Sequence, residues 1–95
     1  MHNKRQPIDR KSAEAIAIQG LAFLAEEPAR LQRFLLVSGL EPREIRARAD
    51  TPELMQAVLE HLAGDESLLL VFATSRQIAP ESIGPAIRAL QAPQP

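Results

Sequence analysis

Apolar residues recur every three or four positions from residue 13 to residue 24, the spacing that places side chains on one face of an α-helix. Asp9 or Ser12 supplies a side-chain oxygen for the first free amides, as at many helix starts. Additional apolar residues on the flanks indicate that this helix is central and covered on more than one side. The positions with helical spacing are Ala13, Ile16, Ala17, Gly20, Leu21 and Leu24.

Proline and glycine residues mark the next helix boundaries. Pro28 fits the first turn of a second helix, where its missing amide hydrogen would lack a partner anyway, and Gly39 suits the left-handed conformation that ends a helix. Pro42 then begins a short third helix with Ile45 as its apolar anchor. Segment 50–53, Asp-Thr-Pro-Glu, combines an N-cap, an early proline and a capping acid, and therefore begins a fourth helix.

Glycine, proline and acidic residues also mark helix boundaries in the second half of the chain. Gly64 and the acid that follows it predict the end of the fourth helix and the start of a fifth. Within the fifth, the apolar run 68–73 is compatible with a buried strand or with a helix. Pro80 begins the last element, but the Gly-Pro pair at 84–85 interrupts it, because proline inside a helix removes a backbone hydrogen bond. We expect a short first turn and then a helix over about 84–90.

A shift of 38 residues aligns 24–45 with 62–83 without a gap. The matches fall on helix faces and turns, where one helix-turn-helix unit used twice would require them. Because the shift places 68–73 opposite part of the second helix, it favours a helix there. The identical pairs are Leu24/Leu62, Ala25/Ala63, Leu31/Leu69, Phe34/Phe72, Pro42/Pro80 and Ile45/Ile83.

These patterns predict an all-α fold, a compact bundle of five to six short helices. The two similar units, about 24–45 and 62–83, are expected to pack on each other and on the N-terminal helix, since two units are too few for a solenoid. Residues 9–91 are predicted to form a single helical domain, between a flexible arm at 1–8 and a frayed tail at 92–95.

Composition agrees with a folded helical protein of the cytoplasm. Hydrophobic residues make up 45% of the 95 positions, and only three residues are aromatic. The absence of cysteine excludes disulfides and thiolate metal sites, so we expect a reducing cytoplasm. No apolar run reaches the roughly 18 residues of a membrane span.

Charge is distributed unevenly along the chain. Residues 1–49 hold nine Lys and Arg against six Asp and Glu, whereas residues 50–95 hold two against six. This asymmetry is compatible with intramolecular packing, head-to-tail self-association or a charged partner. A nucleic-acid interface is one alternative, but net charge is only −1 and no stacking aromatic residues are interleaved, so a solvated helix face is favoured. The candidate contacts are Arg30, Arg33, Arg43, Arg46 and Arg48.

The sequence offers little that indicates catalysis. His61 and Asp65 are four residues apart, but Gly64 separates them and no further His or Cys is near, so a solvated helix end is favoured over a metal site. No serine has a His or Lys partner at motif spacing, and no phosphate-binding loop is present. We expect no catalytic residues, cofactor or metal, and hold a small hydrolase or metal-binding protein only as a third alternative.

The predicted second and fifth helices contain more apolar residues than one buried face requires. Either these helices are central in the bundle, or the surplus forms a homodimer or partner interface. The preferred hypothesis is a non-enzymatic protein interaction module. The surplus residues are Leu35, Leu36, Val37, Leu68, Leu70 and Val71.

Several runs of packing and turn residues recur together over about 12–90. They are Ala13–Leu24 with Gln19 and Phe23, Leu24–Leu31, Phe34-Leu35, Ser38–Pro42, Ile45–Ala49, Val58–Leu62, Asp65–Leu69 and Ile78–Glu81. With these runs the chain resembles a family of small alphaproteobacterial proteins of unknown function. The resemblance implies an all-helical bacterial cytoplasmic protein and supplies no activity or catalytic residue. The Gly-Pro pair at 84–85 departs from the uninterrupted last helix expected of such a family.

Overall fold

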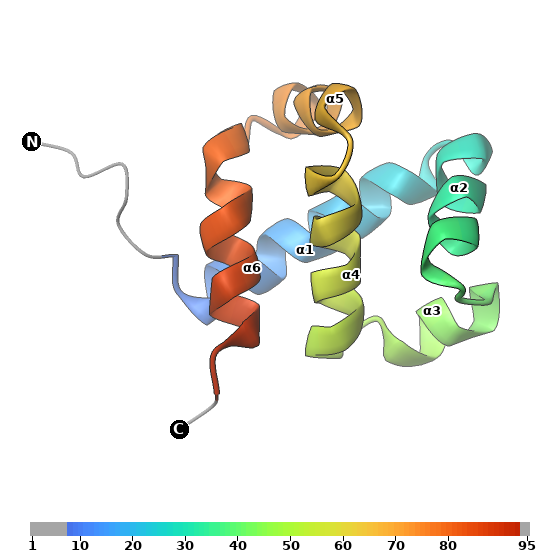
Figure 1. Ribbon diagram of the computed structural model, residues 1–95, viewed down its shortest axis with the longest axis horizontal. Helices are drawn as coiled ribbons and strands as arrows, with labels where there is room; N and C mark the ends of the chain where they lie inside the picture. The colour runs from blue at the N-terminus through green and yellow to red at the C-terminus, as the bar shows by residue number, and fades with distance from the viewer. Residues whose placement is uncertain (1–7, 94–95) are drawn as a thin grey trace, which may run out of the picture.

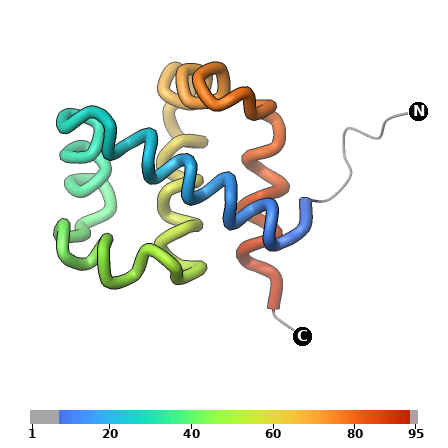
Figure 2. The backbone as a smooth tube through the Cα atoms, turned by 180° about the vertical axis from the view of Figure 1, so that it is seen from behind, coloured from blue at the N-terminus to red at the C-terminus, as the bar shows by residue number. Residues whose placement is uncertain are grey.

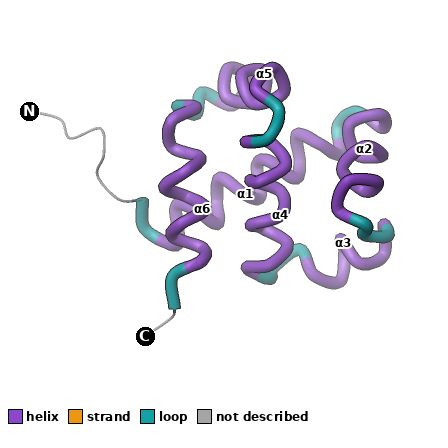
Figure 3. The backbone as a smooth tube through the Cα atoms, in the orientation of Figure 1, coloured by secondary structure: helices purple, strands orange, loops and turns teal. Residues whose placement is uncertain are grey.

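The computed structural model describes residues 8–93, which form six α-helices and one 3-10 turn without a strand (Figures 1 and 3). The all-α bundle is therefore confirmed, and run 68–73 is helical. None of the described helices is long and apolar enough to cross a bilayer. The elements are α1 Arg10–Ala25, α2 Pro28–Ser38, α3 Pro42–Arg48, α4 Pro52–Ala63, α5 Glu66–Arg76, η1 Pro80–Ser82 and α6 Ile83–Gln91.

The ends of the predicted domain are only partly described. The arm at 1–7 and the last two residues of the predicted tail, 94–95, lie outside the described residues. Ile8, which the sequence places in the arm, is half-buried and packs against the core. The packed part of the described chain therefore includes a residue that the sequence assigned to the arm.

Helix starts follow the local chemistry of the sequence. The Asp9 carboxylate accepts a hydrogen bond from the Ser12 amide at 2.7 Å, and the hydroxyl of Thr51 accepts one from the Leu54 amide at 3.3 Å. Asp65 likewise caps α5. These oxygens satisfy amides that have no partner inside the helix, which is why each helix begins where it does.

The Gly-Pro pair at 84–85 lies at the start of the last helix and does not break it. η1 forms the expected short first turn, and α6 begins at Ile83, one residue earlier than predicted. Pro85 is the third residue of α6, where a helix amide has no internal acceptor, so the proline removes no hydrogen bond.

The helices form two layers. α1 lies across one face of the molecule, and α6, α4 and α2 stand side by side on the other (Figures 1 and 2). α1, α4 and α6 pack most extensively against one another, so the N-terminal helix is central as predicted. The predicted cover on a second side is wrong, because the apolar flank residues Ala15, Ile18 and Ala22 are exposed. The contact surface of α1, α4 and α6 contains most of the core, including the fully buried Leu24, Leu59, Leu62 and Ala86.

Gly20 marks the closest approach of α1 to α4. A Cβ atom at this position would lie 3.0 Å from Cγ1 of Val58 and 3.1 Å from Cδ1 of Leu62. Such distances are shorter than ordinary contacts between carbon atoms. The two helices therefore pack this closely because residue 20 has no side chain.

Two helices end in the left-handed conformation. Gly39 closes α2 with φ of 76°, and Gln77 closes α5 with φ of 57°. The sequence predicted this ending for Gly39 but not for Gln77. A left-handed conformation strains any residue with a Cβ atom, so the end of α5 carries a strain that the end of α2 avoids.

Exchanging the residue types at these two positions tests that strain. Gln77→Gly is expected to raise the free energy of unfolding by about 0.5–1 kcal/mol, and Gly39→Gln to lower it by about 1 kcal/mol. Urea unfolding followed by circular dichroism measures both changes. No atom lies within 4 Å of a Cβ at Gly39, so a loss there reflects backbone conformation alone. Equal stability of Gln77→Gly and wild type would contradict the strain.

A second prediction concerns the close contact between α1 and α4. Gly20→Val is expected to lower the free energy of unfolding by about 1–3 kcal/mol, because the added methyl groups overlap with α4. Ala22→Val places the same side chain at an exposed position of the same helix and should cost about 0.5 kcal/mol. Similar losses for the two variants in thermal and urea unfolding would show that the contact imposes no such limit.

Candidate functional site

The predicted apolar surplus divides into exposed and half-buried residues. Leu36 and Val37 of α2 are 78% and 67% exposed, and Leu70 and Val71 of α5 are about half exposed at 48% and 49%. The other two candidates, Leu35 and Leu68, are half-buried, and Leu68 packs against the core. One further exposed apolar residue, Ile18 of α1, was not among the predicted set.

The exposure of these residues follows from the helical period. Each helix buries one phenylalanine, Phe34 in α2 and Phe72 in α5. At about 100° per residue, Leu36 and Leu70, each two positions from its phenylalanine, point to the opposite face, whereas Val37 and Val71 lie on the flanks. Since α2 and α5 lie at the edges of the bundle (Figure 1), no described helix covers those faces.

A hollow of about 250 Å³ lies between α2 and α4. Phe34 and Ala57 form part of its apolar lining, Val37 and Ser38 border it on α2, and Glu60 and His61 border it on α4. Two adjoining hollows extend it along α4. One reaches Leu54 and has a volume of about 200 Å³. The other, of about 470 Å³, reaches Gly64 and the first residues of α5. Because neighbouring hollows share lining residues, we describe the three together as the α2–α4 groove.

The groove exists because only one flank of α4 is covered along its length. α6 packs beside α4 on that flank, whereas α2 contacts α4 less extensively on the other (Figure 1). Between them, α3 is short and contains no buried residue. The α2-facing side of α4 is therefore accessible along about three helical turns.

His61 lies in the wall of the groove and is not the solvated helix end that the sequence predicted. Its ring meets the Phe34 ring edge to face, with the centroids 5.2 Å apart. Its Nε2 atom is buried and has no hydrogen-bond partner among the described residues. Burial lowers the pKa of His61 below its usual 6.5, the charge of Arg33 lowers it further, and Asp65 opposes the shift. Burial and Arg33 thus both favour the neutral form of the imidazole.

The surroundings of His61 bear on the metal or hydrolase alternative. The described part of the chain contains no group of three His, Cys, Asp or Glu side chains arranged to hold a metal ion. A hollow adjoins His61, and Ser38 and Glu60 line the same hollow. Among the described residues, neither of them forms a hydrogen bond with the Nε2 atom of His61.

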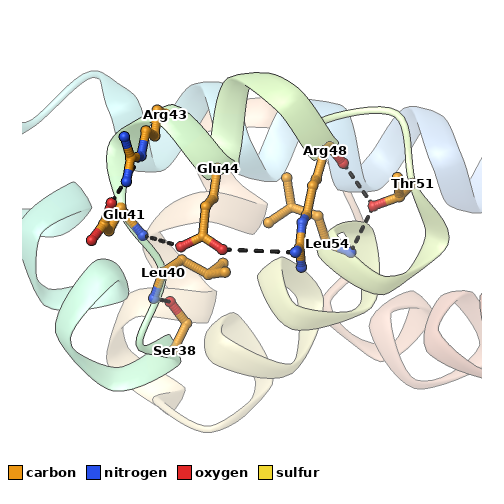
Figure 4. Close-up of polar contacts among 8 residues, drawn as sticks. All are labelled: Ser38, Leu40, Glu41, Arg43, Glu44, Arg48, Thr51 and Leu54. Carbon is orange, nitrogen blue, oxygen red and sulfur yellow. Dashed lines mark hydrogen bonds and ion pairs between the residues drawn. The ribbon is translucent and has the colours of Figure 1, made fainter.

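Of the five candidate nucleic-acid contacts, three make contacts within the chain. Arg30 stacks on the Phe23 ring, 4.1 Å from its centroid. Arg43 pairs with Glu41 at 3.0 Å and Arg48 with Glu44 at 3.8 Å (Figure 4).

The remaining two arginines, Arg33 and Arg46, are exposed and lie on different helices. Arg33 borders the α2–α4 groove. The structure thus disperses the positive charge that the sequence concentrates between residues 30 and 48, and couples much of it to neighbouring acids.

A contact near this region joins α1, α2 and α5. Arg76 of α5 donates a hydrogen bond to the Glu26 carboxylate at 2.6 Å, and Arg30 and Arg76 both lie over the Phe23 ring. Phe23 in turn contacts Phe72, with ring centroids 5.3 Å apart. The sequence contained no sign of the pairing between Glu26 and Arg76, because the partners are 50 residues apart.

The lowered pKa of His61 predicts a pH dependence of stability. In the unfolded chain His61 takes up a proton near pH 6.5, whereas in the folded chain its pKa is lower. The free energy of unfolding therefore falls as the pH drops through and below 6.5. His61→Gln is expected to reduce the loss in free energy of unfolding between about pH 7.5 and about pH 5.5. Urea unfolding at several pH values measures the loss for wild type and variant. Identical pH profiles would show that the fold does not disfavour the charged ring.

Comparison with known proteins gives one match. A family described as a protein of unknown function, DUF3572, matches residues 10–93, which includes all six helices. No curated protein and no solved structure matches the chain. The match extends over most of the sequence, and the chain belongs to the DUF3572 family.

Proposed function

We propose that this chain is a non-enzymatic protein interaction module that binds through the exposed apolar faces of α2 and α5. The observation that supports this function is the exposure of Leu36 and Val37, at 78% and 67%, on the surface of a helix that already buries Phe34. Complete burial of one such side chain contributes about 1.5–3 kcal/mol. A partner that covers these residues gains that free energy without any rearrangement of the core.

We also infer that the two halves are one structural unit used twice. The shift of 38 residues carries the bounds of α2, residues 28–38, onto those of α5, residues 66–76. It also carries Gly39 onto Gln77, and these are the two residues with positive φ among those described. Each unit therefore presents the outer face of its middle helix, which supports a role for both faces in binding.

The nucleic-acid alternative has less support than the interaction module. Arg43 and Arg48 are paired with acids, and Arg30 covers a buried aromatic ring. A phosphate contact by these groups would have to compete with existing partners. The metal alternative has little support, because the described residues contain no group of three potential metal ligands. The resemblance to alphaproteobacterial proteins supports a bacterial cytoplasm as the setting of the module.

Affinity capture tests the interaction module. Purified wild-type chain is used as bait in lysate of its own cell, beside a Leu36→Asp and Leu70→Asp double variant. We expect wild type to retain a defined protein, or its own untagged copy, and the double variant to lose it, because each new charge would be buried at the interface. The matched control is a Gln19→Asp and Gln91→Asp double variant, which adds the same charges at exposed positions of α1 and α6, away from the outer faces of α2 and α5.

The control should retain what the wild type retains. Circular dichroism of all three proteins verifies that their helices are intact. Capture that is equal for wild type and both variants, or the absence of any retained protein including the chain itself, would contradict a module that binds through these faces.

A further inference from the structure

We propose that His61 holds helix α2 against α4 only while its ring is uncharged, and that uptake of a proton releases α2 and α3 from the bundle. This inference goes beyond the proposed function, because it concerns the movement of one segment and requires no partner. Two features of the described residues support it. One is the weak attachment of α2 and α3, and the other is the position of the groups that act on the charge of His61.

The segment formed by α2 and α3 has little buried surface. Phe34 is the one buried residue of α2 and α3 has none, whereas α4 has five and α6 has three. Leu31, Leu40 and Ile45 pack against the core but are only half-buried. The ion pairs of α3 lie within the segment, which stands at the edge of the molecule (Figure 1). Local openings of a folded protein involve such weakly packed units.

The buried Phe34 meets α4 at the ring of His61. The two rings lie edge to face with their centroids 5.2 Å apart, and Nε2 of His61 is buried without a hydrogen-bond partner among the described residues. A charged imidazole has an N–H donor at both nitrogens, so in this position it leaves a buried donor unpaired. Hollows of about 250 and 470 Å³ adjoin the ring, so water reaches its surroundings while the helices remain packed.

The groups that resist protonation belong to α2. Burial lowers the pKa of His61 most, and the charge of Arg33 lowers it further. Both the phenylalanine that covers the ring and Arg33 are part of α2, so both influences disappear when this helix leaves. Asp65 at the start of α5 raises the pKa of His61 and stays in place. The other charged groups that border the hollows beside the ring, Glu60 and Glu66, stay as well.

A proton is therefore bound more tightly at His61 in the released form than in the packed form. In the released form the pKa of His61 returns toward its usual 6.5, whereas in the packed form it is lower. Above pH 6.5 the ring is neutral in both forms, and pH does not affect the release. As the pH falls through 6.5, the released form takes up the proton first and its population grows. The growth ends below the pKa of the packed form, after a rise of about tenfold for each unit between the two pKa values.

Amide hydrogen exchange followed by NMR tests the release with the full chain, between about pH 5 and about pH 7.5, where carboxylates stay charged. We expect the amides of α2 and α3 to share an opening that is more frequent than the unfolding of α1, α4 and α6. Low concentrations of urea separate the two events, because release exposes less surface than unfolding. The opening constant of α2 and α3 should rise below pH 6.5, by the factor that the measured pKa of the His61 ring requires.

Two pairs of variants locate the cause of the rise. In His61→Gln the opening constant of α2 should be the same at both ends of the pH range, whereas His2→Gln, which removes the only other histidine of the chain, should keep the wild-type rise. Arg33→Gln should raise the pKa of His61 and reduce the rise. Arg46→Gln makes the same substitution at an exposed position of α3 and should change neither quantity.

A pH-dependent opening of α2 and α3 that is lost in His61→Gln supports the release. It is overturned if these amides exchange only when the whole chain unfolds, if the wild-type opening is constant with pH, or if His61→Gln shows the same rise. Circular dichroism verifies that the helices of each variant are intact. Should His61→Gln lose its helices, the comparison of Arg33→Gln with Arg46→Gln decides, because both changes are at exposed positions outside the contact between the rings.

Discussion

The contact between α1 and α4 at Gly20 determines how the rest of the molecule is arranged. Without a side chain at residue 20, the two helices approach until Val58 and Leu62 leave too little room for a Cβ atom at that position. Helix α6 completes this centre by packing on both of them. The three helices bury most of the large apolar residues, so α2 and α5 need to contribute only one face each. The exposed faces of these two edge helices are thus a consequence of a core that closes without them.

Helix boundaries were predictable from sequence because their chemistry is local. Pro28 and Gly39 begin and end α2 as predicted, and the structure selects Asp9 from the two predicted caps of α1 and Thr51 from segment 50–53 as the cap of α4. The left-handed Gln77 was missed, since glutamine carries no local signal for that conformation. The α2–α4 groove and the burial of His61 were missed for a different reason. Both depend on the distance between two helices that are separated in the chain, and helical periodicity contains no information about that distance.

The sequence indicated two candidate surfaces, one basic and one apolar, and the tertiary contacts of their residues differ. Charge density suggested a basic patch between residues 30 and 48, but ion pairs with Glu41 and Glu44 and stacking on Phe23 engage much of it. The apolar surplus was equally ambiguous, since a central helix and an interface helix have the same sequence pattern. The exposure of the side chains distinguishes a central helix from an interface helix. In α2, Phe34 is buried, whereas Leu36 and Val37 are exposed to solvent.

The difference between α3 and α6 explains why one flank of α4 remains open. Both helices follow a similar turn, yet Ile83 of α6 is 2% exposed whereas Ile45 of α3 is only half-buried. After Ile83, α6 continues its apolar face through Ala86 and Leu90, and both side chains are buried. After Ile45, α3 has arginines and ends within one turn, so it has too little apolar surface to pack along α4. The second unit therefore closes the core with its last helix, and the first unit leaves the corresponding apolar surface of α2 and α4 available to a partner.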